Sequence, residues 1–447
     1  MKVQSNLRHL WQQWKNYWFY PAPLFNLAIL RIVAIGFQVI YLFQKNFLSQ
    51  LLEHAALPTA LYAPLPILQL LSQWVGWGDR PTLLVLMSTF WLTVFTGVFA
   101  LLGAGTRITV LLFAVGNLLI QAYLYSFGDF HHPDALLIIS LLILAFSPCG
   151  QTLSVDDLRN RLKHNIQRRE FVSFNLLAEK SKFAKWPLLL IQWLFSLIYL
   201  SAGLSKLESG GSWMNGYTLQ YYLVRDGLRW GSDLGVWLGQ HHGLAIASSW
   251  FAVLFEITFC FVLLVPRLAL IYVPLGIALH AGIYLAQRAP FFQFIALYVV
   301  FVPWAAVLRR LVQRQQPAQR QKPEILYDGL CPLCIRSMTV VRYFDWLNQL
   351  TYSDLELRWN SLKEKYPQLS FEDCRREMHV LLPNGSTKRG FFAFREILRY
   401  LPPLWPLLGL FYLPLAGLVG PKTYGWVASR RSQFQHCTYD NCSVDAD

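Results

Sequence analysis

Two cysteines separated by two residues, Cys331 and Cys334, are the clearest candidates for chemistry in this sequence of 447 residues. They end the run Tyr-Asp-Gly-Leu-Cys-Pro-Leu-Cys at 327–334, and residues 335–344 have helical periodicity. We therefore expect a strand over 324–327, a tight turn and the start of a helix. A thiol at a helix N-terminus faces the positive end of the helix dipole, which favours the thiolate. A second thiol one turn later can resolve a mixed disulfide, so the spacing predicts thiol–disulfide exchange. Cys331 is the expected nucleophile because it is nearer the helix start.

Two alternatives remain open for this pair: half of a zinc site, or two unreactive thiols. Zinc needs four ligands, usually from two such pairs. Cys437 and Cys442 are separated by four residues rather than two, and they equally suit a tail disulfide or a relay pair. We expect redox chemistry and no metal. The other candidate ligands near the pair are Cys374, His379, His436, Cys437 and Cys442.

The surroundings of the pair resemble the DCC family of thiol–disulfide oxidoreductases, which is named for one Asp and two Cys. Here these residues are Asp328, Cys331 and Cys334, and the resemblance makes them the expected catalytic residues. It covers roughly residues 323–435 and implies a thioredoxin-like fold without a required cofactor. Four further segments fit the family pattern: Phe344-Asp345-Trp346, a strand ending at Ser353-Asp354, a strand–turn–strand–helix over 378–390, and 424–431.

Composition indicates that this domain follows a membrane protein. Hydrophobic residues make up 55% of the chain and charged residues 14%, whereas a soluble globular protein has about a quarter charged residues. The net charge of +14 could suggest nucleic acid. However, the basic residues lie between apolar segments and not on one basic module, so membrane topology explains them better and no nucleic-acid partner is expected.

The apolar segments predict a polytopic α-helical membrane domain of about eight spans over residues 1–312. A basic linker at 313–322 and a small α/β thioredoxin-like domain at 323–447 follow it. The Trp-rich stretch up to Tyr20 is expected to lie at the membrane interface, and the proline-broken stretch 50–75 to be re-entrant or interfacial. The predicted spans are 25–43, 82–103, 107–126, 133–148, 186–205, 247–265, 268–287 and 291–308.

Positive charge predicts the orientation. Arg107, Arg267, the N-terminus, the stretch 156–185 and the linker 309–322 carry most of the Lys and Arg, and eight spans put them all on one side. By the positive-inside rule that side is cytoplasmic. An inner or plasma membrane protein with both termini in the cytoplasm is expected, and there a CxxC pair is catalytic more often than structural.

Six ionisable residues fall within or beside the spans: Arg31, His131, His132, Lys206, Glu256 and His280. Such residues at membrane depth are functional candidates by default. Each also has a structural explanation. Lys206 suits a snorkelling anchor at a span end, the two neighbouring histidines suit plain loop residues, and His280 suits a packed core histidine.

Residues 202–207, Ala-Gly-Leu-Ser-Lys-Leu, resemble the vitamin K-dependent gamma-carboxylase and its bacterial relatives that carry the horizontally transferred transmembrane domain. Four other segments fit: Leu30-Arg31-Ile32, 147–156, Phe255-Glu256 and Leu279-His280. The resemblance covers about residues 15–305. It implies that Lys206 is a base that deprotonates vitamin K hydroquinone, and that His131 or His132 assists. A lysine in apolar surroundings can act as a base near neutral pH. The large lumenal region that binds the protein substrate is missing from this chain.

Three functions compete. The first is a membrane-anchored protein thiol–disulfide oxidoreductase whose partner is a protein thiol or disulfide. The second is a carboxylase-like membrane enzyme that acts on a quinol or lipid, with vitamin K hydroquinone or another quinone as its cofactor. The third is a non-enzymatic membrane scaffold. The CxxC pair favours the first.

Overall fold

The chain packs into two units, which a computed structural model describes except at residues 1, 77, 79, 129–131, 316–320 and 431–447. The first unit comprises residues 1–154 and 180–304, and the second comprises 155–179 and 305–447. This division differs from the expected boundary near residue 312, because a segment between two apolar helices of the first unit packs in the second.

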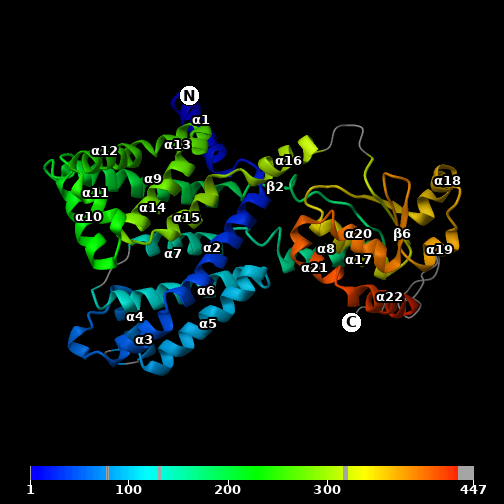
Figure 1. The fold of residues 1–447 in the computed structure, drawn as a ribbon, viewed down its shortest axis with the longest axis horizontal. Coiled ribbons are helices and arrows are strands. Elements are labelled where there is room, and N and C mark those ends of the chain that lie inside the picture. Colours follow the sequence, from blue (N-terminus) through cyan, green and yellow to red (C-terminus); the bar gives the residue numbers. More distant parts are fainter. Residues whose placement is uncertain (1, 77, 79, 129–131, 316–320, 431–447) are drawn as a thin grey trace. The chain divides into compact units, whose positions relative to one another are not determined.

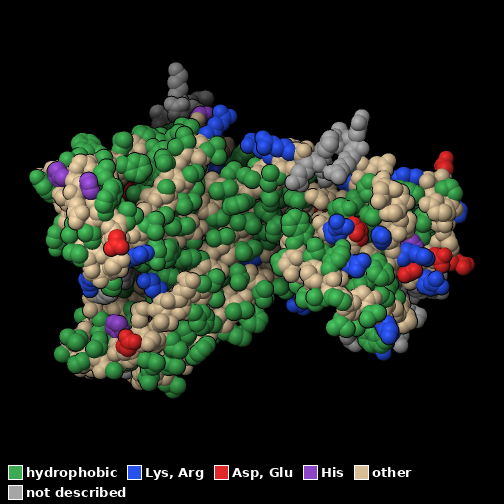
Figure 2. All heavy atoms as spheres, in the orientation of Figure 1, with side chains coloured by type: hydrophobic (Ala, Val, Ile, Leu, Met, Phe, Trp, Pro, Cys, Tyr) green, Lys and Arg blue, Asp and Glu red, His purple; other side chains and the backbone are tan. Residues whose placement is uncertain are grey.

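Apolar helices long enough to cross a membrane form the first unit (Figure 1). Hydrophobic side chains dominate its visible face, whereas most visible charged side chains lie on the second unit (Figure 2). An apolar surface of this extent suits lipid, so the chain is an integral membrane protein. Six helical segments qualify among the described residues: α2 (Leu24–Gln44), α5 (Leu83–Leu102), α6 (Thr106–Tyr125), α9 (Lys185–Glu208), α12 with α13 (His242–Thr258, Phe261–Leu264) and η2 with α14 (Pro266–Leu268, Ala269–Gln287).

Two predicted spans differ in the structure. The span expected at 133–148 is the shorter helix α7 (His132–Ala145), which has 14 residues. The span expected at 291–308 is broken into α15 (Phe292–Leu297), η3 (Tyr298–Phe301) and α16 (Trp304–Gln315). Pro303 separates the last two pieces, since it has no N–H for a helical hydrogen bond.

The remaining described elements of the first unit do not qualify as membrane spans. The stretch 50–75 contains the short helices α3 (Phe47–Ala56), η1 (Thr59–Leu61) and α4 (Pro66–Val75), as its prolines predict. The N-terminal helix α1 spans Lys2–Phe19, and a two-residue strand β1 (Ala22–Pro23) pairs antiparallel with β2 (Lys180–Ser181). The helices α10 (Tyr217–Trp230) and α11 (Asp233–Gln240) lie between α9 and α12 in sequence and were not predicted.

The second unit is built on a four-stranded sheet with the order β4-β3-β5-β6. Strand β3 (Glu324–Tyr327) pairs parallel with β4 (Thr351–Asp354) and antiparallel with β5 (His379–Leu381). Strand β6 (Thr387–Arg389) closes a hairpin with β5 and leads into α20 (Gly390–Leu398), which confirms the predicted strand–turn–strand–helix. This mixed sheet with helices is the expected thioredoxin-like arrangement.

Side chains of β3 alternate between two apolar cores, as the period of two in a strand requires. Ile325 and Tyr327 belong to the core that includes Met338 of α17 (Pro332–Phe344). Leu326 belongs to the other core, with Leu355 and Cys374 from α18 (Leu355–Lys365) and α19 (Phe371–Arg376). The chain ends its described part with η4 (Pro402–Leu404), α21 (Trp405–Phe411) and α22 (Pro414–Ser429).

Segment 155–179 completes the second unit. Its helix α8 (Val155–Arg168) packs on α17, where Asn165 Nδ2 donates to Thr339 Oγ1 at 2.9 Å and both side chains are buried. Phe171 then lies against Tyr327 and Tyr352, with ring centroids 5.8 and 5.2 Å away. The sequence showed only a basic stretch at 156–185, because contacts with residues more than 100 positions away leave no local pattern.

Candidate functional site

The two cysteines occupy the start of α17, directly after β3. Cys331 is the N-cap residue and has an extended backbone (φ −90°, ψ 114°), and Pro332 takes the first helical position, where its missing N–H costs nothing. Cys334 lies in the first turn. The predicted strand, turn and helix are confirmed, and Cys331 lies at the positive end of the helix dipole.

Asp328 shapes the turn that delivers Cys331 to the helix. Its Oδ1 accepts from the backbone N–H of Leu330 at 3.0 Å, and its backbone carbonyl accepts from Cys331 N at 3.3 Å. The carboxyl is buried, with the Arg375 guanidinium 4.0 Å away. Gly329 next to it has no room for a side chain, since a Cβ there would come within 1.9 Å of Asp354 Oδ2. This close approach places the carboxyl of Asp354 beside the turn, and burial raises its pKa.

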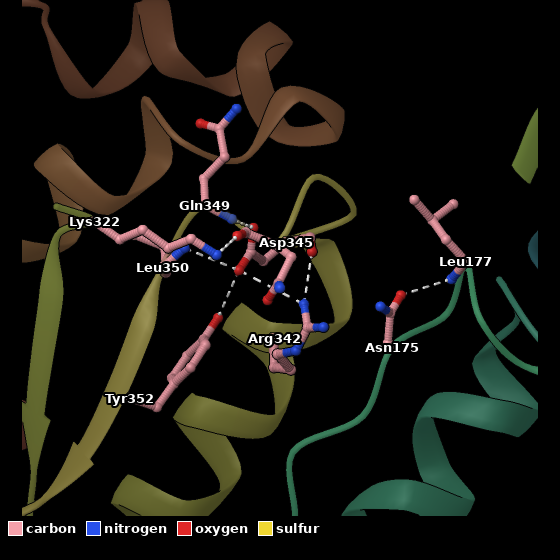
Figure 3. Close-up of polar contacts among 9 residues, drawn as sticks. Asn175, Leu177, Lys322, Arg342, Asp345, Gln349, Leu350 and Tyr352 are labelled. Atoms are coloured by element: carbon pink, nitrogen blue, oxygen red, sulfur yellow. Dashed lines mark hydrogen bonds and ion pairs between the residues drawn. The ribbon is translucent and has the colours of Figure 1, made fainter. Parts of the chain in front are cut away.

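A second buried carboxylate, Asp345, fixes the other end of α17 (Figure 3). Its oxygens accept from Gln349 N at 2.8 Å, from Leu350 N at 3.3 Å and from the Tyr352 hydroxyl at 3.3 Å. Arg342 Nη1 lies 3.6 Å from the carboxylate and donates to the Asp345 carbonyl at 2.7 Å. Burial raises the pKa of the Asp345 carboxyl, although the N–H groups and Arg342 oppose the shift. Asp345 therefore holds the connection from α17 to β4 and does not touch the cysteines in any described contact.

Access differs between the two cysteines. Cys331 is 0% exposed and Cys334 is 6% exposed. A cavity of about 520 Å³ is lined by Asp328, Cys334 and Ser337 and otherwise mostly by apolar side chains, but Cys331 does not line it. In this conformation a ligand within the second unit reaches the pair through Cys334.

Cys374 of α19 lines the same cavity. It is 2% exposed, and burial raises the pKa of its thiol to about 11, with the Asp373 charge adding to the shift and Arg389 opposing it. A thiol of this kind is a poor nucleophile near neutral pH, so Cys374 acts as an apolar wall residue. His379, another candidate zinc ligand, is buried in β5, its Nδ1 lies 2.8 Å from the Glu377 carbonyl, and burial lowers its pKa.

Across the described part of the chain, no three His, Cys, Asp or Glu side chains gather closely enough to hold a metal ion. His436, Cys437 and Cys442, which could complete a four-ligand zinc site with the CxxC pair, lie outside the described residues.

Lys206 and Glu256 meet in the first unit. Lys206 Nζ lies 2.8 and 2.7 Å from the two carboxylate oxygens of Glu256, and 5.3 Å from the ring centroid of Trp213. Gly203 makes this possible, because a Cβ there would come within 2.7 Å of the Ile257 side chain on α12. The helices α9 and α12 therefore approach closely one turn before Lys206.

His280 joins a separate hydrogen-bonded group of three. The Tyr199 hydroxyl lies 2.6 Å from His280 Nε2 and 2.5 Å from the Tyr298 hydroxyl, and all three side chains are buried. Tyr199 and Lys206 both lie on α9, seven residues apart, and Tyr199 is close enough to Glu256 for an electrostatic interaction. The structure places four of the six predicted membrane residues: Lys206, Glu256, His280 and Arg31. Glu256 and His280 both contact side chains of α9, Glu256 at Lys206 and His280 at Tyr199.

Arg31 lies elsewhere. Its side chain is 0% exposed and donates to the backbone carbonyls of Cys149 and Leu153. Arg31 therefore provides hydrogen-bond donors for the turns that follow α7. No described contact joins Arg31 to Lys206. His131 lies outside the described residues, and His132 begins α7 with a side chain that the structure does not describe.

Among the buried polar groups of the first unit that sequence reasoning missed is the one around Asp134. Asp134 accepts from Gln121 at 2.8 Å, from the Tyr125 hydroxyl at 3.2 Å and from Gln293 at 2.5 Å. The signal was present, since Gln121 and Gln293 are polar residues inside apolar stretches.

Comparison with known families agrees with both halves of the chain. The model of the HTTM domain matches residues 26–303, and the model of the DCC1-like thiol-disulfide oxidoreductase matches residues 325–437. No curated protein and no solved structure matches the chain. The HTTM match covers more than half of the sequence. The chain therefore belongs to the HTTM domain family, and it carries a DCC1-like thiol-disulfide oxidoreductase domain behind that membrane domain.

Proposed function

We propose that this protein is a membrane-anchored thiol–disulfide oxidoreductase that uses Cys331 and Cys334 on protein thiols or disulfides. The observation that carries the proposal is the position of both cysteines at the start of α17, Cys331 as the N-cap and Cys334 in the first turn, inside the matched redox domain. One thiolate attacks a substrate sulfur and forms a mixed disulfide, releasing the other substrate sulfur as a thiolate. The second cysteine then attacks the first, so the substrate leaves with two thiols and the enzyme holds a disulfide. The reverse sequence oxidises a substrate dithiol.

The order of attack has two opposing physical arguments. The helix dipole acts most strongly on Cys331, which favours that thiolate, and it is our proposed nucleophile. Access favours Cys334, which lines the cavity. Cys331 is fully buried, so attack by Cys331 requires the chain around it to open during substrate binding.

Single-cysteine variants of the full chain in detergent test both points. The prereduced wild type should reduce insulin disulfides in a single turnover, whereas the variant with both Cys331→Ser and Cys334→Ser should not. Cys334→Ser should accumulate a mixed disulfide on Cys331, which peptide mass spectrometry locates. Cys260→Ser is the matched control, since this half-buried cysteine lies in the first unit. Activity that survives loss of both cysteines would refute the proposal. If a mixed disulfide accumulates on Cys334 in Cys331→Ser, and none accumulates on Cys331 in Cys334→Ser, then Cys334 is the nucleophile.

A carboxylase-like quinol chemistry is a second candidate, favoured by the pairing of Lys206 with Glu256. Nζ donates to both carboxylate oxygens, so a role as a base first requires its proton to pass to Glu256. Hydroquinone oxidation by dissolved oxygen, catalysed by the full chain in lipid nanodiscs, should then fall in both Lys206→Ala and Glu256→Gln. The control Lys182→Ala, a Lys on the same unit away from the pair, should not change it.

For orientation we propose that both termini lie in the cytoplasm, on the positive-inside rule. Reporter fusions at each terminus test this, and a periplasmic or extracellular signal from either one would refute it.

A further inference from the structure

The cavity beside Cys334 has the size and lining of a small-molecule site. Its volume of about 520 Å³ lies within the usual range of ligand pockets. All of its lining residues belong to the second unit, and its walls come from α17, α20, α21 and α22. Polar side chains are few, and three of them, Asp328, Cys334 and Ser337, come from the turn before α17 and its first two turns. This is an apolar pocket with a reactive end.

The walls favour a flat ring over a peptide. Five aromatic side chains line the cavity, and the rings of Phe391 and Phe411 stack with centroids 6.0 Å apart at 17°. Tyr424 is held by its hydroxyl, which accepts from Met378 N at 2.9 Å. Aromatic rings pack well on planar conjugated partners. A peptide backbone would instead bury its N–H and C=O groups against apolar walls, which costs free energy for each unpaired group. The other two rings are Tyr327 and Phe394.

The helices α21 and α22, which form one wall of the cavity, are apolar enough to contact lipid. Residues 402–411 and 414–429 qualify together as a membrane segment, bent by 103° at the break between them. Their outward side chains include Leu415 at 71% exposed and Leu418 at 70%. A soluble domain does not ordinarily leave such neighbours uncovered. We take this face to contact the bilayer, which gives a lipid-soluble molecule a short route into the cavity.

We propose that this cavity binds a lipid-soluble quinone, which oxidises the cysteine pair through Cys334. The inference rests on the proposed function, because it supplies the acceptor for electrons that protein thiols deliver to the pair. In the step, the two thiols lose two electrons and two protons and join in one S–S bond. The quinone gains the same two electrons and two protons and leaves as the quinol. A two-electron acceptor with an apolar body and a planar head fits both the reactive end and the aromatic walls.

Binding is tested first, without redox chemistry. The full chain with both Cys331→Ser and Cys334→Ser is placed in nanodiscs and titrated with a short-chain benzoquinone, and quenching of protein fluorescence is followed. Ala416→Phe, which fills the cavity from α22, should weaken binding at least 10-fold. Leu415→Phe, one residue away but exposed and not lining the cavity, should leave binding within 2-fold. Ser337→Leu narrows the cavity from α17 and guards against a folding defect of the first variant. Equal binding in all variants would overturn the site.

Oxidation is tested next in the prereduced wild-type cysteine background. Anaerobic quinone should convert Cys331 and Cys334 to the disulfide with loss of quinone absorbance one for one, and Ala416→Phe should slow this at least 10-fold. The rate with hydroxyethyl disulfide, a small hydrophilic oxidant, should change less than 2-fold in the same variant. Oxidation by a lipid hydroperoxide but not by quinone would overturn the quinone assignment. Insulin reduction that persists while quinone neither binds nor reacts would refute this inference and leave the proposed function standing.

Discussion

Replacing Asp345 by Ala should lower the free energy of unfolding of the second unit and leave the first unit folded. The substitution removes the acceptor for two backbone N–H groups and the Tyr352 hydroxyl, and it leaves Arg342 buried without its ion-pair partner. Removing one partner of a buried pair costs about 3–5 kcal/mol. The carbonyl of residue 345 still accepts from Arg342, which places the expected loss near the lower end of that range. A domain of ordinary stability has only about 5–15 kcal/mol to lose.

The measurement uses Cys374 as an internal reporter. This thiol is 2% exposed in the folded unit, so pulse alkylation in increasing urea labels it only when the unit opens. Asp345→Ala should move the labelling midpoint to a lower urea concentration, by the shift that corresponds to a loss of about 3 kcal/mol in the free energy of unfolding. Asp345→Asn keeps one acceptor oxygen and should lower the free energy of unfolding by about 1–2 kcal/mol. Glu364→Ala on the exposed face of α18 is the control and should shift the midpoint by less than about 0.5 kcal/mol. A shift in Asp345→Ala no larger than that of Glu364→Ala would refute the role of this carboxylate.

Two further predictions follow from burial in the second unit. Burial raises the pKa of Cys374 from 9.0 to about 11, so the unfolded chain loses this proton at a lower pH than the folded unit does. The free energy of unfolding should therefore fall as the pH rises from 9 to 11, by about 2–3 kcal/mol relative to Cys374→Ala. Urea titrations of both proteins at pH 8, 9, 10 and 11 check this, and a difference that does not change with pH would contradict it. Phe171→Ala should destabilise the second unit by about 1–3 kcal/mol and speed alkylation of Cys334, because the ring supports Tyr327. Phe183→Ala, an exposed ring in the first unit, should change neither, and equal effects of the two would show that segment 155–179 does not support the redox unit.

Local chemistry made part of this architecture predictable. The strand, turn and helix around Cys331 follow from an apolar run, Asp-Gly and a proline at the first helical position, all of which act within ten residues. The six long apolar helices were predictable for the same reason, since length and apolar content are properties of each segment alone.

Contacts between distant residues were not predictable from one sequence. Asn165 meets Thr339, and Lys206 meets Glu256, only because helices pack in a particular way. The close approach at Gly203 and the complete burial of Cys331 also depend on packing between elements. Residues 402–429 were also missed as an apolar pair, because their five prolines interrupt the pattern of a continuous helix.

The discontinuous second unit affects how the protein is made. Asn165 and its partner Thr339 are 174 residues apart. At a translation rate of about 5–20 residues per second, α8 leaves the ribosome roughly 9–35 s before α17 is available. During that delay the α17-facing side of α8 and the ring of Phe171 have no final partner, while the membrane helices between them are being inserted. The redox unit can therefore be completed only after the membrane helices between α8 and α17 have been made, and a chain truncated before residue 324 would leave α8 without its redox-domain partners.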